Sequence, residues 1–164
     1  MKKFAALILA LMMVVPMVAM AEAVKSPALD GFTSASTTNY YTASALTGDD
    51  LMNAANSQSG FYLICTVNPD GSPNAAVLVF AIKKLNDKYY IQLGMAENQS
   101  KANLEATGEG LAIYAAVVEG QAIAATGARL YFKAIEDQAV VDELMKDARQ
   151  GAAFFEITEV LPLG

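Results

Sequence analysis

Few side chains in this chain offer obvious catalytic chemistry, and their types restrict what the protein can do. The 164-residue sequence contains no histidine. A histidine-activated serine or cysteine nucleophile therefore cannot be assembled within one chain. Cys65 is the only cysteine, which excludes an internal disulfide. Its place in an apolar run favours a small buried hydrophobic side chain over a reactive thiol. Without histidine or a second cysteine the usual zinc and haem ligands are poorly supplied, so we expect no metal site of that kind. A carboxylate-only calcium or magnesium site stays open, although the sequence has no Asp-x-Asp loop pattern.

The basic residues are too few and too scattered to bind nucleic acid. Asp and Glu outnumber Lys and Arg by 17 to 11, which gives a formal net charge of −6. Nucleic-acid binding needs clustered basic side chains that neutralise phosphates, and the nearest approach to a cluster is Lys83-Lys84. Arg129 stands in an apolar segment and must find a partner if it is covered. A structural salt bridge is the favoured interpretation, and contact with a ligand is the alternative.

Residues 1–21 have the pattern of a secretory signal peptide. Lysines precede an apolar run that begins at Phe4, and Ala19 and Ala21 form a small-x-small cleavage site. The alternative is an uncleaved membrane anchor. The apolar run is short for crossing a bilayer and ends at the cleavage pattern, which favours cleavage. We therefore expect an exported protein, periplasmic or extracellular, with no membrane association after cleavage.

The rest of the chain divides into a spacer and one domain. Residues 22–46 are rich in Ser, Thr, Ala and Asn and lack apolar periodicity, so they are interpreted as a spacer or arm. Residues 47–164 carry the periodic apolar segments and are long enough for one domain.

Apolar patterns and turn signals predict a mainly β domain with flanking helices. The expected order is a helix at 47–56, strands at 61–67, 74–82 and 88–94, a helix at 100–106, strands at 111–118 and 121–134, a helix at 137–149, and a strand at 153–161. Mostly antiparallel strands of this number suggest a small closed barrel. The segment 74–82 is nearly all apolar and is expected to be covered on both faces. The apolar strands exceed what one small barrel can bury, which predicts a second buried surface, most simply a homodimer interface.

Three segments carry a resemblance to a known family. They are residues 66–76, Ser100-Lys101-Ala102-Asn103-Leu104 and Gly127-Ala128-Arg129-Leu130. In this order they resemble the opening hairpin, the motif ending in Asn-Leu and part of the long strand of the pyridoxamine 5'-phosphate oxidase-like split barrels. The order of elements is most similar to that of small bacterial FMN-binding proteins. The resemblance covers about 47–164 and implies a six-stranded antiparallel split β-barrel of Greek-key type.

The resemblance also implies a homodimer that holds FMN in a groove between the subunits. Family members lay the backbone of the second strand along the isoalloxazine edge and bind the phosphate at the helix that follows the third strand. The matching residues here are Ala76, Val77, Leu78, Asn98, Gln99, Ser100 and Lys101. Backbone amides at a helix start and a serine hydroxyl suit a phosphate dianion.

Gln99 departs from the family pattern, which usually has Arg or Lys at this position. One charge-assisted hydrogen bond is worth about 1.5–3 kcal/mol. The departure therefore leaves three outcomes open: weak FMN binding, a different ligand, or none. Lys101 either contacts the phosphate or pairs with Glu97 or Glu105 along the helix. Ser100 either caps the helix or lines the cofactor site, and these two roles are compatible.

Two functions from different classes follow from these residues. The first is an exported FMN-binding protein in electron or hydride transfer, in which the flavin carries the chemistry. If it is an enzyme, an FMN-dependent oxidoreductase is the expected class, and no catalytic residue can be assigned. The second is a dimeric module of the cell envelope without flavin, which uses the groove for another small ligand or only for dimerisation.

Overall fold

The computed structural model describes residues 46–117 and 126–163. The predicted signal peptide, the spacer up to residue 45 and residues 118–125, between the bodies of the strands expected at 111–118 and 121–134, lie outside the described residues. The elements are α2 (Gly48–Asn56), β1 (Phe61–Val67), β2 (Pro73–Val77), β3 (Phe80–Leu85), β4 (Lys88–Gly94), α3 (Gln99–Thr107), β5 (Glu109–Ala115), β6 (Gly127–Ala134), α4 (Gln138–Met145) and β7 (Ala152–Leu161). Within the described ranges, no helix has the length and apolar character that crossing a membrane requires.

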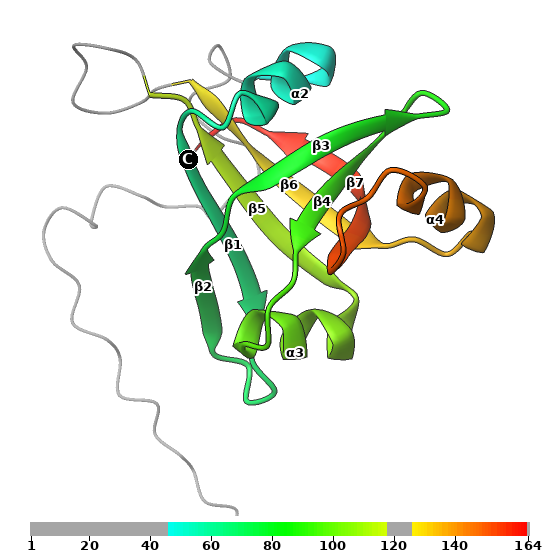
Figure 1. Ribbon diagram of the computed structural model, residues 1–164. Helices are drawn as coiled ribbons and strands as arrows, with labels where there is room; N and C mark the ends of the chain where they lie inside the picture. Colours follow the sequence, from blue (N-terminus) through cyan, green and yellow to red (C-terminus); the bar gives the residue numbers. More distant parts are fainter. Residues whose placement is uncertain (1–45, 118–125, 164) are drawn as a thin grey trace, which may run out of the picture. The chain divides into compact units, whose positions relative to one another are not determined.

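All the strands within residues 46–117 and 126–163 belong to one antiparallel sheet in the order β2-β1-β5-β6-β7-β4-β3 (Figure 1). The connection through α3 returns the chain from β4 to β5, which lies beside β1. Since β2 and β3 follow one another along the chain, β5, β1, β2–β3 and β4 make a Greek key. The predicted mainly β fold, its antiparallel pairing and its Greek-key type are confirmed.

The prediction of six strands is wrong by one, because the segment expected at 74–82 is two strands. β2 pairs with β1, and β3 pairs with β4. Leu78 and Val79 join the two strands outside regular pairing. The chain bends here because its two halves pair with strands at opposite ends of the sheet order. The segment is also not covered on both faces, since Val77 is 83% exposed and Val79 is 51% exposed within one chain.

The core lies inside the curved sheet and is built by alternation along the strands. Tyr62 and Ile64 of β1 point inward beside Tyr114 of β5 and Leu130 and Phe132 of β6, all buried. Edge-to-face contact between Tyr62 and Phe80 joins β1 to β3 across the interior, with ring centroids 5.1 Å apart. These contacts hold the barrel wall that carries the candidate site.

Helices α2 and α3 lie at opposite ends of the sheet, and α4 lies beside β7 and β4 (Figure 1). Asp49 and Asp50 occupy the first turn of α2, where the helix dipole favours negative charge. The Asn56 side chain exchanges hydrogen bonds of 2.8 and 2.9 Å with the backbone of Ile82. The end of α2 therefore satisfies part of the open edge of β3. α4 ends at Met145, four residues earlier than predicted, and a turn follows it.

Gly127 is required by the close packing of β6 against β5. A Cβ at this position would lie 2.1 Å from the carbonyl oxygen of Tyr114, a backbone atom that cannot move aside easily. We expect Gly127→Ala to lower the free energy of unfolding by about 1–3 kcal/mol. Gly94→Ala is the control, because a Cβ there meets nothing within 4 Å. Urea denaturation of both variants measures the difference, and equal stabilities would contradict the assignment.

Candidate functional site

The first turn of α3 contains the residues expected to bind phosphate. Asn98 is the N-cap, and its side-chain oxygen accepts a hydrogen bond from the amide of Lys101 at 3.0 Å. The capping interpretation of Ser100 is therefore wrong, because the helix begins one residue earlier than predicted. The amides of Gln99 and Ser100 donate to no acceptor within the described residues, as expected for the first turn of a helix. These two amides face outward from the helix end and could receive an anion.

A buried polar network fixes this turn against the sheet. The side-chain amide nitrogen of Asn103 donates to the hydroxyl of Thr66 and to the side-chain oxygen of Asn68, both at 2.9 Å. Asn74 of β2 donates to the hydroxyl oxygen of Ser100 at 3.0 Å. Asn103, Ser100 and Thr66 are each at most 4% exposed. The network thus joins β1, the following turn, β2 and α3 through side chains that sequence patterns did not connect.

Asn103→Ala tests how much this network contributes to the free energy of unfolding. The change removes a buried side chain that also accepts a hydrogen bond from Gln99 at 2.8 Å. It leaves buried polar partners unsatisfied, so we expect a loss of about 1–3 kcal/mol in the free energy of unfolding.

Gln99→Ala is the matched control for Asn103→Ala, since it removes the same Gln99–Asn103 bond from the exposed side. It should cost less than 1 kcal/mol, on the order of a single exposed hydrogen bond. Equal denaturation midpoints for the two variants would show that the network contributes little.

Lys101 is held by carboxylates of its own helix region. Its ammonium forms ion pairs with Glu97 and, at 3.5 Å, with Glu105. Hydrogen bonding to Glu97, followed by the charges of both glutamates, raises the pKa of Lys101 above its ordinary value. Of the two roles considered for Lys101, the structure shows the pairing along the helix, and the positive charge of Lys101 is already balanced. An anion at the start of α3 would have to compete with these carboxylates.

The second predicted segment lies farther along β2. Ala76 pairs with Ile64, and Val77 pairs with Leu63 on the opposite face of the strand. Leu78 packs against the core cluster. The structure brings Asn74, at the start of β2, to α3, while Ala76, Val77 and Leu78 lie two to four residues beyond that contact. Asn74 therefore links β2 to the first turn of α3. Within the described chain, no hydrogen bond joins residues 76–78 directly to residues 98–101.

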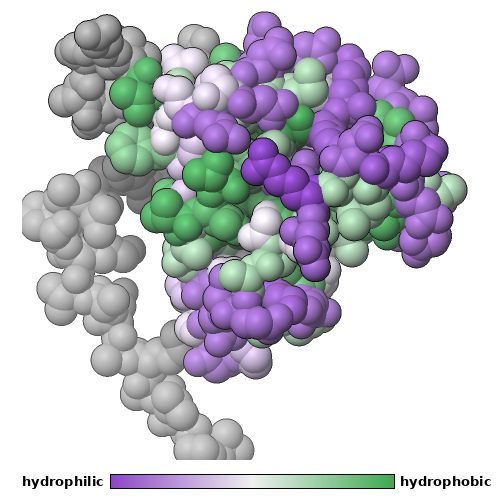
Figure 2. All heavy atoms as spheres, in the orientation of Figure 1, coloured by the Kyte–Doolittle hydropathy of each residue, from purple (hydrophilic) through white to green (hydrophobic). Residues whose placement is uncertain are grey.

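Four adjacent strands turn apolar side chains away from the barrel interior. Cross-strand pairs place residues of β2, β1, β5 and β6 on the same side of the sheet. We call this surface the outer face; its members are Phe61, Leu63, Cys65, Val67, Pro73, Ala75, Val77, Leu111, Ile113 and Tyr131. Figure 2 shows apolar side chains at the surface around β1 and the segment that joins β2 to β3. Polar side chains cover α2 and α3 on either side of it.

A groove of about 470 Å³ opens on the outer face and is lined mainly by the ends of β1, β5 and β6. Cys65 lines it together with Val67, Leu111 and Tyr131. The expectation of a fully buried Cys65 is wrong, because Ile64 and Thr66 take the inward positions and leave Cys65 half-buried on the outer face. Burial still raises the pKa of its thiol, so at neutral pH the unreactive thiol form prevails.

Arg129 borders the outer face, opposite Ile113 in the β5–β6 pairing. Its Nε donates to the carbonyl oxygen of Pro162 at 2.8 Å. The favoured salt bridge is absent from the described residues, and Arg129 instead donates a hydrogen bond to a backbone carbonyl. Across the same ranges, no three His, Cys, Asp or Glu side chains come close enough to hold a metal ion.

No family model matches the sequence, and no curated protein matches it. Solved structures do. An FMN-binding protein from Syntrophomonas wolfei subsp. wolfei superimposes with a TM-score of 0.52 at 18% identity, over 71% of this chain and 85% of the other. A variant of HupZ from Group A Streptococcus gives a TM-score of 0.50 at 14% identity, over 72% of this chain and 100% of the other. These likenesses establish the fold.

Proposed function

This chain has the split-barrel fold of the FMN-binding proteins, and we propose that it is itself an FMN-binding homodimer. The proposal includes export to the periplasm or medium, which the sequence pattern of residues 1–21 supports. It also includes a role in electron or hydride transfer, the chemistry that a bound flavin supplies.

The observation that carries the proposal is the uncovered outer face. Its exposed members include Phe61, 67% exposed, and Val77, 83% exposed. A contiguous apolar surface of this kind is unusual on a monomer and marks an interaction site. A second copy is the simplest cover, because a two-fold interface places the same surface on both sides. Ala76, Val77 and Leu78 would then lie at the edge of a crevice between the copies.

The residues present fit a flavin in part. The apolar surface around Val77 suits a flat aromatic ring, and the β2 backbone runs beside it. The amides of Gln99 and Ser100 suit the phosphate. The negative charge of the phosphate has no free cation beside it at the start of α3, because Lys101 is paired with Glu97 and Glu105.

Each part of the chain has a defined task in this proposal. The network around Asn103 holds the first turn of α3 so that its amides point in a fixed direction. The second copy excludes water from the crevice and thereby strengthens every polar contact inside it. The chain offers no histidine for proton transfer, so its contribution is binding and orientation.

The same observations on Lys101 and Gln99 favour a second candidate function. A dimeric envelope module without flavin would keep the outer face and would not need a cation at the start of α3. Gln99 is hydrogen-bonded to Asn103, which shows that its side chain has a role inside the chain.

Titration with FMN, followed by quenching of flavin fluorescence, tests the proposal. We expect saturation at one FMN per chain with a dissociation constant of about 1 µM or tighter. Riboflavin, which lacks the phosphate, should bind more weakly by about tenfold or more if the α3 amides hold the phosphate. Folded protein that binds neither flavin would exclude the first function and leave the second.

A further inference from the structure

A second cavity, of about 350 Å³, lies between the sheet and the start of α4, and it shares Lys133 with the groove on the outer face. Its lining consists of Asn86, Lys88, Tyr90, Lys133, Ile135, Glu136, Asp137, Val140 and Glu156. None of these residues belongs to the proposed flavin site. From this cavity we infer a binding site for a small primary amine in its protonated form, and the inference does not depend on flavin binding.

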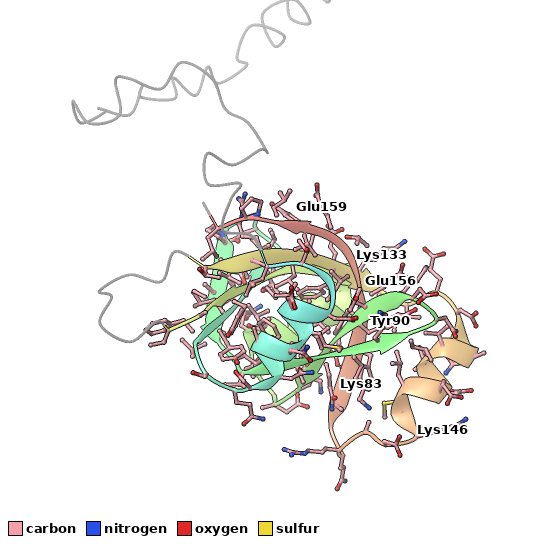
Figure 3. All side chains as sticks on the ribbon, turned by 90° about the horizontal axis from the view of Figure 1, so that it is seen from above. Lys83, Tyr90, Lys133, Lys146, Glu156 and Glu159 are labelled. Atoms are coloured by element: carbon pink, nitrogen blue, oxygen red, sulfur yellow. The ribbon has the colours of Figure 1, made fainter. Side chains whose placement is uncertain are left out.

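Strand register builds the floor of the cavity. Tyr90 of β4 stands opposite Glu156 of β7, which in turn stands opposite Lys133 of β6. Side chains at paired positions project from the same side of a sheet. Figure 3 shows Lys133, Glu156 and Tyr90 following one another across the sheet beside α4. The row therefore brings a phenol, a carboxylate and an ammonium to one place.

The hydroxyl of Tyr90 is available to a ligand in this cavity. Tyr90 is only 2% exposed, and its ring packs with Leu144 and Phe154 beneath α4. The hydroxyl has no hydrogen-bond partner among the described side chains, and it is not a sealed-off polar atom, because no fully buried polar side-chain atom of the described chain lacks a partner; it therefore opens into the cavity. Its surroundings include Glu156, Lys88 and Asp137, whose charges all act on it. A hydroxyl that opens into a cavity without a protein partner can bond to a small molecule there.

The charged side chains that line the cavity determine whether it favours a positive or a negative ligand. Glu156 binds Lys88 at 2.8 Å, and Lys133 lies 3.4 Å from Glu136. Each of these two ion pairs is neutral, so the carboxylate of Asp137 gives the lining a net charge of one negative. Asp137 uses its Oδ1 to cap α4, by accepting from the amide of Ala139. The site thus favours a single positive charge over an anion.

The remaining features select an ammonium group with N–H donors. Burial, and then the charge of Glu156, raise the pKa of Tyr90, so its hydroxyl is neutral at pH 7 and can accept a hydrogen bond. A metal ion does not fit, because no three suitable ligands converge in the described chain. Ile135 and Val140 offer apolar wall for a short alkyl body. The ligand class is therefore a primary ammonium on a small apolar group.

NMR of tyrosine-labelled protein tests the inference, with n-butylammonium chloride as the probe. We expect a saturable shift of the Tyr90 signal with a dissociation constant on the order of 1 mM. Tyr90→Phe, followed by calorimetry, should weaken binding by about tenfold or more. Tyr89→Phe is the control, because the Tyr89 hydroxyl bonds to Asp49 outside the cavity. It should leave the affinity unchanged.

Other probes and a second variant complete the test. Butyltrimethylammonium has the same charge but no N–H donors, and should bind at least about tenfold more weakly. Butanoate should not bind. If Tyr90→Phe does not fold, Glu156→Gln in the wild-type tyrosine background should also weaken butylammonium binding. No saturable shift, equal binding of the quaternary ion, or unchanged affinity in the variant that folds would overturn the inference.

Discussion

Replacing Val77 by lysine is expected to convert a dimer into monomers without unfolding the chain. The side chain is 83% exposed within one chain, so the substitution should change the stability of the monomer by less than about 0.5 kcal/mol. In a dimer joined through the outer face, the same lysine would be covered without a partner. An uncompensated buried charge costs about 3–5 kcal/mol, and a two-fold interface contains it twice.

Sedimentation velocity at several protein concentrations measures this effect. We expect the dissociation constant of the dimer to rise by at least about a hundredfold. Met145→Lys is the matched control: Met145 is also exposed and apolar, at 42%, but it lies on α4 and outside the outer face. It should remain dimeric. Dimers of unchanged stability in Val77→Lys would place the interface elsewhere, and a monomeric wild-type protein would remove the dimer altogether.

The second large effect is expected from Gln99→Arg. Gln99 is the first residue of α3, next to the amides proposed to hold the phosphate. A new guanidinium there can form a charge-assisted, bidentate contact that Lys101, paired with Glu97 and Glu105, does not supply. One such contact is worth about 1.5–3 kcal/mol, so the affinity for FMN should rise by about one to two powers of ten.

Gln138→Arg is the control for this change, since Gln138 is likewise the first residue of a helix, behind the N-cap Asp137 of α4. It adds the same charge far from the proposed site and should leave FMN affinity unchanged. Riboflavin affinity should also stay unchanged in Gln99→Arg, because riboflavin carries no phosphate. If Gln99→Arg does not raise the affinity for FMN, the proposed crevice at the start of α3 is shaped for a different ligand. The dimeric module without flavin would then be the better interpretation.

Local signals in the sequence were sufficient for most of the elements. β1 and β4 have the predicted bounds, because each is an apolar segment that ends at a clear turn signal. The break between β2 and β3 was missed for a physical reason. Leu78 and Val79 continue an apolar run without Gly or Pro, and the bend comes from pairing with two strands that are far apart in the sheet order.

The candidate site was less accessible to sequence reasoning. The pairing of Lys101 with Glu97 and Glu105 follows from helical spacing, and it is one of the two roles that the sequence leaves open for Lys101. The contacts of Asn103 with Thr66 and Asn68 join segments about 35 residues apart, which only the folded chain brings together. One signal in the sequence points to such a network. Asn103 is a polar residue next to Leu104, and both lie on the buried side of α3.

Incubation with FMN, gel filtration and a visible absorption spectrum of the eluted protein show whether a dimer of this chain binds flavin. We expect flavin absorption that elutes with the dimer peak at one flavin per chain and disappears when Val77→Lys separates the copies. A well-folded dimer that elutes colourless would contradict it.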